Sequence, residues 1–165
     1  MSIERLWAGW RSAYVSDDST GRTDTPCVIC NLVAATDDVA ALVLERTAQT
    51  ITVMNLYPYA SGHLLVAPVR HVPSFEDLDD DELIALSRAQ VRGLRALRAA
   101  YTPDGVNLGV NIGRAAGAGV PTHLHVHVLP RWNGDTNFTT TVAGVRVMPE
   151  DLGTGYDKLL AAWPR

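Results

Sequence analysis

The chain has 165 residues, of which 47% are hydrophobic and 19% are charged, and its formal net charge is −4 at pH 7. This length suits one domain with a sizeable core. No apolar run is long enough to span a membrane, and the acidic balance argues against binding nucleic acid through a basic surface. The N-terminal residues lack an apolar signal core, so we expect a cytoplasmic protein.

The N-terminal part combines an apolar segment, a loop and a cysteine pair. Residues 3–15 carry large apolar side chains at near-helical spacing, which is typical of a helix or of a packed arm. Residues 16–26 are rich in Ser, Asp, Thr and Gly and predict a loop. Cys27 and Cys30 follow in a short knuckle. In a cytoplasmic protein their spacing indicates metal binding or redox chemistry rather than a structural disulfide.

Short apolar runs separated by turn residues predict three strands in the first half of the chain. These runs cover residues 41–46, 50–55 and 63–68, and Pro68 closes the third. Adjacent runs joined by short loops favour antiparallel pairing.

The second half begins with a long helix. Acidic residues at 79–82 suit a helix N-terminus, and apolar residues at helical spacing continue to about residue 100. Strands are expected at 105–113 and 121–132, and a C-terminal helix is expected from residue 149 onwards. Strands, one helix and then two more strands predict an α+β fold rather than alternating βαβ units.

Three of the five histidines lie in the last expected strand. His123, His125 and His127 alternate with apolar residues, which predicts apolar side chains in the core and imidazoles on the opposite face, about 6.5–7 Å apart. The alternative is a half-exposed strand whose polar face happens to be histidine. We favour a site that uses imidazole chemistry, because other polar residues would serve that face as well.

Two kinds of chemistry fit this row of histidines. Alternating histidines on a strand can share a metal ion that keeps an open position for water. A neutral imidazole can instead attack phosphorus and form a covalent intermediate. The glycine-rich loop at residues 113–119 favours phosphate chemistry, because its backbone N–H groups are accessible to an anion.

The histidine segment also resembles a known family. Residues 123–129, His-Leu-His-Val-His-Val-Leu, are similar to the His-φ-His-φ-His-φ-φ motif of the histidine triad (HIT) family of nucleotide hydrolases and transferases. Residues 55–71 resemble the upstream signature of that family, and residues 27–30 resemble the Cys-x-x-Cys knuckle of many bacterial members. Residues 5–7 and 130–138 are similar to a bacterial branch that includes diadenosine tetraphosphate phosphorylases of actinobacteria.

This resemblance implies a single HIT domain over residues 1–165. Its core would cover about 25–132, with an N-terminal arm at 1–24 and a C-terminal extension at 133–165. The implied fold is an antiparallel sheet of about five strands with one long helix and a C-terminal helix. Members of the family form homodimers whose sheets join, so a homodimer is expected.

The resemblance further implies roles for individual side chains. His125 would be the nucleophile that takes up a nucleotidyl group from the α-phosphate, and His127 would bind the phosphate or help to protonate it. His63 would support the triad from a neighbouring strand. Asn111 would hydrogen-bond the phosphate near the nucleophile, and Asn55 would hold the ribose hydroxyls.

The glycine-rich loop would line the polyphosphate path with the backbone donors of Gly117, Ala118 and Gly119. Gly119 stands near a position where many members carry Gln and some phosphorylases carry Ser. Thr122 stands where the actinobacterial phosphorylases carry an acid. Both departures touch the acceptor side of the site, so water and inorganic phosphate stay open as the second substrate.

A zinc site follows from the same resemblance. Zinc-bearing members use positions that match Cys27, Cys30, His71 and His123. Two Cys and two His ligands make a closed tetrahedral site, which would orient the strand and leave no position for water. His123 would thus belong to both the triad and the metal site. Two reduced cysteines packed in a small core are the alternative, and a redox pair lacks the βαβ context that such motifs need.

The implied function is cleavage of dinucleoside polyphosphates at the α-phosphate through a nucleotidyl-histidine intermediate, which water or inorganic phosphate releases. Three alternatives stay open. The first is hydrolysis of phosphoramidates or other AMP conjugates. The second is a metal-dependent hydrolase with three histidine ligands, and the third is a nucleotide-binding regulator without turnover. No organic cofactor is expected.

Overall fold

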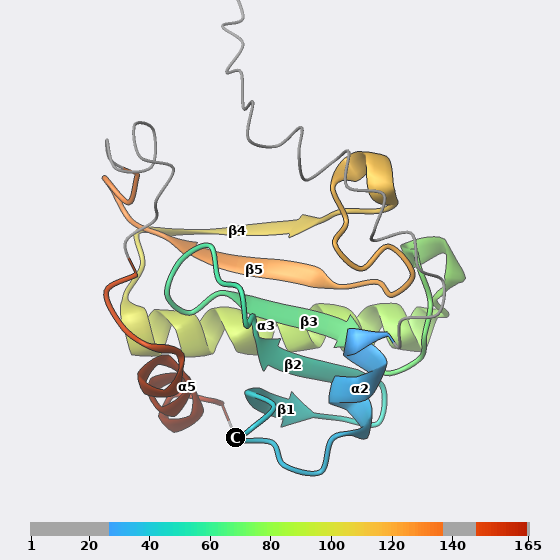
Figure 1. Ribbon diagram of the computed structural model, residues 1–165, viewed down its shortest axis with the longest axis horizontal. Coiled ribbons are helices and arrows are strands. Elements are labelled where there is room, and N and C mark those ends of the chain that lie inside the picture. The colour runs from blue at the N-terminus through green and yellow to red at the C-terminus, as the bar shows by residue number, and fades with distance from the viewer. Residues whose placement is uncertain (1–26, 137–147, 165) are drawn as a thin grey trace, which may run out of the picture.

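The structure, a computed structural model, describes residues 27–136 and 148–164. A five-stranded antiparallel sheet with the order β1-β2-β3-β5-β4 dominates it (Figure 1). The strands are β1 (Val43–Arg46), β2 (Thr50–Met54), β3 (Leu64–Pro68), β4 (Gly105–Val110) and β5 (Val126–Arg131). The helices of the described part are α2 (Val28–Ala34), α3 (Asp80–Tyr101) and α5 (Leu152–Ala161), with 3-10 turns at Phe75–Asp77 and Arg114–Ala116.

The predicted α+β fold, its five strands, the long helix and the C-terminal helix are therefore confirmed. The helix or arm expected at residues 3–15 lies outside the described residues, as does part of segment 130–138. Over the parts of the chain that the structure describes, no helix is both long and apolar enough to cross a bilayer.

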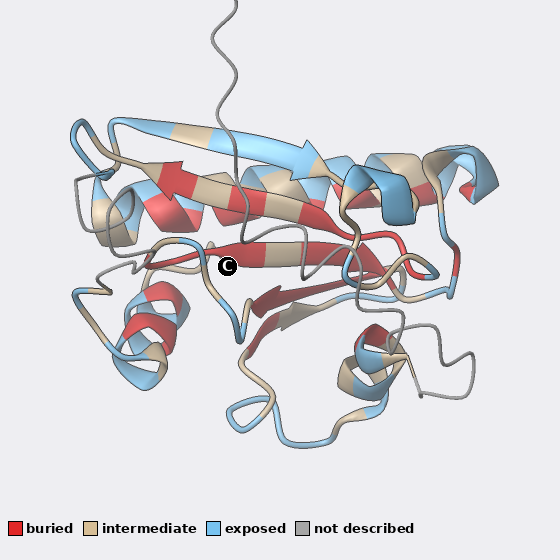
Figure 2. Cartoon of the chain, turned by 45° about the horizontal axis from the view of Figure 1, so that its top comes forward, coloured by how far each residue is buried: buried red, intermediate tan, exposed pale blue. Residues whose placement is uncertain are grey.

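Helices cover the two faces of the sheet unequally. Helix α3 runs along one face, and helix α5 packs beside it at one end (Figure 1). The core on that side includes Leu64, Val66, Leu86, Leu97 and Val128. On the opposite face, the short helix α2 packs over β1 to β3 through Ile29, Val43, Ile51, Val53 and Ala67. No helix of the described part stands in front of β5 and β4 on this second face, and β4 is largely exposed (Figure 2).

The histidine strand begins later than the predicted residue 121. β5 begins at Val126, so His123 and His125 precede the strand and only His127 lies within it. The predicted burial of the alternating apolar residues is confirmed. However, His123 and His125 are also buried, with 1% and 6% of their surfaces exposed. The three imidazoles therefore do not form one evenly spaced row on a solvent-facing strand.

Pro68 explains why the ladder stops before His125. The β3–β5 register, continued by two residues beyond Val66 and Val126, places Leu124 opposite Pro68. A proline has no N–H for a ladder hydrogen bond. Leu124 N–H donates instead to the carbonyl of Val72 (2.6 Å), in the loop that follows β3.

The cysteine knuckle turns out to be the start of a helix, which the residue pattern did not predict. Cys27 is the residue before helix α2, and Cys30 lies in its first turn. Asn31 N–H donates to the Cys27 carbonyl (3.0 Å) and closes that turn. Because residues three apart share one face of a helix, both thiols face the same side.

Candidate active site and metal centre

His63 and His127 form a directly hydrogen-bonded pair across β3 and β5. Nε2 of His63 lies 2.9 Å from Nδ1 of His127. The backbone N–H of Tyr59 donates to Nδ1 of His63 (3.1 Å), and the amide of Asn55 lies 3.2 Å from the same atom. Because a backbone N–H only donates, neutral His63 carries its proton on Nε2 and donates it to His127. Neutral His127 must then carry its own proton on Nε2.

The surroundings of His127 keep its ring neutral. Burial, and then the repulsion that a protonated His125 would exert, lower the pKa of His127 to about 4. Gly109 of β4 lies directly opposite His127 in the sheet, and no atom lies within 4 Å of the point where a Cβ of Gly109 would stand. A neutral Nε2–H donor thus sits at the part of the sheet that helix α2 leaves uncovered.

His125 has the opposite tautomer. Its Nδ1 lies 2.8 Å from the carbonyl oxygen of His123, which can only accept a hydrogen bond. The proton of a neutral His125 ring is therefore on Nδ1, and Nε2 presents a free lone pair. The rings of His125 and His127 meet edge to face with centroids 5.1 Å apart. The site therefore combines an unprotonated imidazole nitrogen with a neighbouring imidazole donor.

The two asparagines expected in the site lie at strand ends near this pair. The β4–β5 register ends with Val110 opposite Val126, and the same register continued by one residue places Asn111 opposite His125. Asn55 directly follows β2, where its Oδ1 accepts from Tyr57 N–H (3.0 Å) while its amide points to His63. Both positions agree with the roles expected for these side chains, which stay predictions.

The glycine-rich loop is folded back on itself. Gly117 N–H donates to the Arg114 carbonyl (2.9 Å), and Ala118 N–H donates to the Gly113 carbonyl (3.4 Å). Gly113 and Gly117 both have positive φ, a conformation that a glycine adopts at little cost. The N–H groups expected to bind phosphate at 117 and 118 are thus used within the loop, and only a rearranged loop would offer them to a ligand.

Gly62 fixes the turn that delivers His63 to the site. It has φ +76, and a Cβ placed there would lie 2.9 Å from side-chain atoms of both Leu97 and Tyr101. Replacing Gly62 with alanine should therefore lower the free energy of unfolding by about 2–4 kcal/mol, through backbone strain and overpacking. Thermal and denaturant unfolding measure this loss.

The matched control for this substitution is Gly105→Ala at the start of β4. No atom lies within 4 Å of a Cβ at Gly105. We expect this variant to stay within about 1 kcal/mol of the wild type. Equal stability of the Gly62 and Gly105 variants would show that Leu97 and Tyr101 of helix α3 do not sterically restrict residue 62.

The four predicted metal ligands converge at the N-terminus of helix α2. Sγ of Cys27 and Sγ of Cys30 lie 3.4 and 3.5 Å from Nδ1 of His123, and Sγ of Cys30 lies 3.1 Å from Nδ1 of His71. All four ligand atoms lie within 4.8 Å of one another. Zinc bonds of about 2.0–2.3 Å in a tetrahedron place ligand atoms roughly 3.3–3.8 Å apart. The three sulfur–nitrogen contacts lie near this spacing, and two Cys with two His are a donor set that suits zinc.

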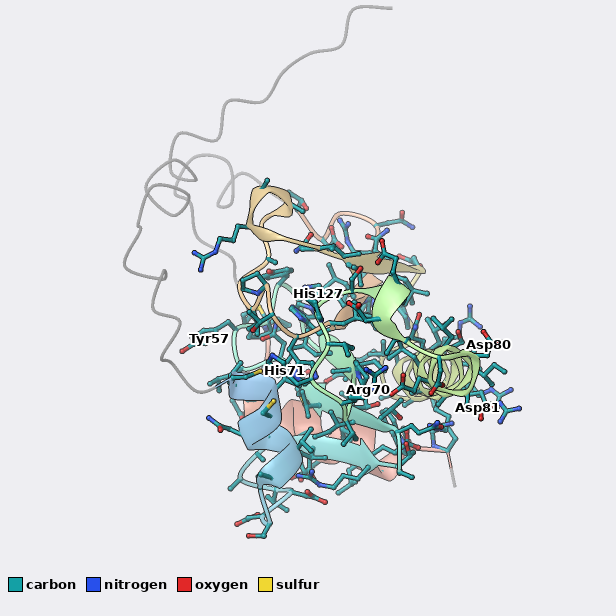
Figure 3. All side chains as sticks on the ribbon, turned by 90° about the vertical axis from the view of Figure 1, so that its right-hand side faces the viewer. Tyr57, Arg70, His71, Asp80, Asp81 and His127 are labelled. Carbon is teal, nitrogen blue, oxygen red and sulfur yellow. The ribbon has the colours of Figure 1, made fainter. Side chains whose placement is uncertain are left out.

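A backbone carbonyl orients the buried ligand of this cluster. Nε2 of His123 lies 2.9 Å from the carbonyl oxygen of Pro68. The Nε2 proton is therefore donated to Pro68, which leaves the lone pair of Nδ1 directed at the thiols. A metal-binding histidine commonly donates its second ring nitrogen in this way. Figure 3 shows His71 beside helix α2, on the more exposed side of the cluster.

Arg70 ties the loop that carries His71 to the start of helix α3 (Figure 3). Its guanidinium donates to both carboxylate oxygens of Glu82 (2.8 and 2.6 Å) and to the carbonyl of Asp77 (2.5 Å). Glu82 also completes a capping box with Asp79, the residue before α3. The hydrogen bonds from Arg70 and then from the Asp79 backbone lower the pKa of Glu82 from 4.5 to about 2.

Glu82→Gln should remove a pH-dependent part of the stability. A carboxylate with a depressed folded pKa stabilises the fold above its unfolded pKa, and this contribution is lost as the pH falls through the folded value. The difference in free energy of unfolding between wild type and variant should be largest above about pH 5 and shrink toward pH 2. Denaturant titrations across this range measure it.

Asp81→Asn, which changes an exposed carboxylate of the same helical turn, is the control for that series. The other acid-sensitive groups are the same in the wild type, Glu82→Gln and Asp81→Asn. Their contributions therefore cancel when the free energy of unfolding of each variant is subtracted from that of the wild type. The ion pair with Arg70 would be contradicted if the difference in free energy of unfolding between wild type and Glu82→Gln did not change with pH.

Fold and site together define an α+β protein with two adjacent functional histidines. His125 offers an unprotonated ring nitrogen and His127 offers an N–H donor, and both lie near a cluster of two cysteines and two histidines. The family model of the HIT domain matches residues 36–134, and the chain belongs to the HIT family. The likeness between residues 123–129 and the triad motif is therefore confirmed.

Relatives within the family agree with this assignment. The chain is 36% identical over 167 residues to a Mycobacterium tuberculosis protein named AP-4-A phosphorylase, with 99% of this chain and 86% of that protein covered. It is 35% identical over 97 residues to an asymmetrical bis(5'-nucleosyl)-tetraphosphatase of Schizosaccharomyces pombe, with 59% and 53% covered. The fold is similar to the crystal structure of a Zn-bound histidine triad family protein from Mycobacterium smegmatis, with TM-score 0.66, 29% identity and coverage of 82% and 91%.

Sequence patterns missed the three backbone groups that set the tautomers, namely the N–H of Tyr59 and the carbonyls of Pro68 and His123. Every residue carries such groups, so only their place in the fold reveals their roles. The sequence marks Pro68 only as the end of a strand, and it does not single out Tyr59.

Proposed function

We propose that this chain cleaves dinucleoside polyphosphates at an α-phosphate by transferring the nucleotidyl group to Nε2 of His125. The observation that carries this proposal is the pairing of tautomers: a free lone pair on His125 next to a neutral N–H donor on His127. Two of the relatives described above are named for enzymes that act on such nucleotides, which supports the same substrate class.

In the first step, Nε2 of His125 attacks the α-phosphorus, a P–N bond forms, and the P–O bond to the rest of the polyphosphate breaks. The leaving polyphosphate is a stable anion, so a hydrogen bond from Nε2–H of His127 is sufficient to stabilise its oxygen. The imidazole of His125 becomes positively charged, and the carbonyl of His123 that accepts its Nδ1–H stabilises that charge.

In the second step, an oxygen of water or inorganic phosphate attacks the phosphorus and the P–N bond breaks, so His125 leaves as a neutral imidazole. Water would release its proton to solvent, whereas inorganic phosphate would attack as an anion. Asn111 would hydrogen-bond the phosphoryl oxygens, Asn55 would hold the ribose, and the loop with Gly117, Ala118 and Gly119 would face the polyphosphate. The register of β4 and β5 and the contact of Asn55 with His63 support the two asparagine roles. The loop would have to rearrange before its N–H groups could bind the polyphosphate.

We also propose that Cys27, Cys30, His71 and His123 hold a structural zinc ion. The support is the convergence of four suitable donors, the orientation of His123 by Pro68, and the likeness to the Zn-bound protein of Mycobacterium smegmatis. Zinc would fix His123, and with it the carbonyl that orients His125. The three histidines do not share one metal, because His123 faces the thiols while His127 faces His63. This arrangement does not favour the metal-dependent hydrolase.

We further propose a homodimer in which β4 of two copies pair. β4 is an edge strand of the sheet, and its side chains are largely exposed, Leu108 at 48%. An exposed edge offers unpaired backbone groups to a second strand.

The product pattern tests the proposed function directly. Diadenosine tetraphosphate is supplied with and without inorganic phosphate, and the nucleotide products are separated. ADP plus ATP formed only with phosphate would show phosphorolysis, and AMP plus ATP formed without phosphate would show hydrolysis. No cleavage in either case, together with turnover of adenosine 5'-phosphoramidate, would replace this proposal by the AMP-conjugate alternative.

A further inference from the structure

A cavity of about 840 Å³ lies beyond His127 along strand β5, between the end of that strand and the segment that leads into helix α5. Its lining includes Tyr59, Ser61, Tyr101, Leu129 and Trp132. Leu129 follows His127 by two residues on β5, so both side chains lie on the same face of the sheet, about 7 Å apart along the strand. One wall of the cavity thus continues the face that carries His127, and residues of helices α3 and α5 supply another wall.

The lining is aromatic and electrically balanced. Tyr101 and Trp132 meet edge to face with ring centroids 6.3 Å apart. Each cation on the wall has an anionic partner, since Arg131 pairs with Asp135 and Lys158 pairs with Glu150 (both 2.5 Å). These pairs leave little positive charge for a phosphate chain. The cavity therefore suits an uncharged planar group, and its volume lies in the range of small-molecule sites.

Tyr59 joins the cavity to the reacting centre. Its ring stacks on that of His127 with centroids 5.8 Å apart and an interplanar angle of 20°, and it also lines the cavity. The hydroxyl of Ser61, on the same wall, is buried and has no hydrogen-bond partner among the described residues. A buried hydroxyl without a partner is costly, and a polar atom of a bound ligand would satisfy it.

We propose that this cavity binds the distal nucleoside of a dinucleoside polyphosphate, that is, the nucleoside attached to the leaving phosphate chain. This inference rests on the proposed function. The leaving oxygen lies at Nε2 of His127, and the chain attached to it can follow β5 past Leu129 to the aromatic wall. The second nucleobase would pack against Trp132 and Tyr101, and Ser61 would hydrogen-bond to the nucleoside.

The experiment compares diadenosine tetraphosphate with adenosine 5'-tetraphosphate, which lacks the distal nucleoside and ends in a phosphate monoester with one more ionisable oxygen. Wild-type protein should show a KM about 5- to 100-fold lower for diadenosine tetraphosphate, because one base stacked on aromatic side chains contributes a factor of this size. Trp132→Ala should raise the KM for diadenosine tetraphosphate toward that of the shorter probe. It should leave kcat, and both constants for adenosine 5'-tetraphosphate, within about twofold.

Two further variants separate this role from loss of structure. Ser61→Ala removes a hydroxyl that has no hydrogen-bond partner among the described residues, so it should not destabilise the fold. It should weaken the binding of diadenosine tetraphosphate and leave the binding of adenosine 5'-tetraphosphate unchanged. Trp163→Ala changes a tryptophan at the end of helix α5 that packs on the core and does not line the cavity. This control should affect the two probes equally.

Binding by the inactive His125→Ala variant keeps the inference separate from the proposed function. Calorimetric titration of this variant with both probes should give the same preference, and adding Trp132→Ala should abolish it. A preference in binding without turnover in the wild type would overturn the proposed function and retain the cavity assignment. The cavity assignment would be overturned if the protein bound both probes with equal affinity. It would also be overturned if Trp132→Ala reduced the affinity for both probes by the same factor.

Discussion

Turnover of diadenosine tetraphosphate is expected to fall by at least about 10⁴-fold when His125 is replaced by alanine, while the fold stays intact. The substitution removes the lone pair that attacks phosphorus, and no other imidazole stands in its place. His123 directs its ring nitrogens to Pro68 and the thiols, and His127 uses Nδ1 to accept from His63. Neither ring can take over the attack without giving up these bonds.

A covalent label provides the second readout for His125. Wild-type protein quenched during turnover of substrate labelled at the α-phosphate should carry the label on denaturing gels under alkaline conditions, where phosphohistidine persists. His125→Ala should carry none, while its melting temperature and metal content match those of the wild type. Normal turnover by the variant, or a retained label, would end the assignment of His125 as nucleophile. Turnover by a wild type that never carries a label would instead indicate a single-step hydrolase.

Loss of the zinc ligands is expected to have the largest effect on stability. Cys30→Ala breaks the cluster at the residue whose Sγ contacts both His71 and His123. Zinc bound to such donor sets contributes several kcal/mol to folding, so the melting temperature should fall by about 10 °C or more. Metal analysis should find one zinc per wild-type chain and less than about one tenth of that in the variant.

Asn31→Ala is the matched control, because Asn31 is exposed on the same helix and lies outside the ligand set. It should keep the zinc and the stability of the wild type. A strong chelator should lower the melting temperature of the wild type to that of Cys30→Ala and leave the variant unchanged. A wild type that contains no zinc and does not respond to the chelator would favour two cysteines simply packed in a small core.

The local patterns that could be predicted are those set by neighbouring residues. Period-2 alternation correctly indicated the strand with Val126 and Val128, and helical spacing correctly indicated α3. The start of β5 could not be predicted, because it depends on Pro68, which lies 58 positions before Val126. Helix α2 was missed because seven residues carry too little periodicity to distinguish a helix from a knuckle.

In the candidate site, too, some features could be predicted from the sequence and others could not. The resemblance to the HIT family indicated which side chains belong together, and the structure brings the four metal donors to within 4.8 Å of one another. The tautomers of His125 and His127 could not be predicted, since carbonyl and N–H groups of the backbone set them. Nor could the cavity beside Trp132, whose wall combines residues from the turn before β3, helix α3, strand β5 and helix α5.

The metal cluster also constrains the order in which the chain can fold. Its ligands come from the start of helix α2, the loop after β3 and the segment before β5. The two sulfur–nitrogen contacts of His123 join residues 93 and 96 positions apart. Contacts of such high sequence separation carry a large loop-closure cost, so we expect them to form after the intervening strands have assembled. A metal ion at this cluster would therefore act on an already folded sheet. It would slow unfolding and leave the rate of folding nearly unchanged, because its bonds would form after the folding transition state.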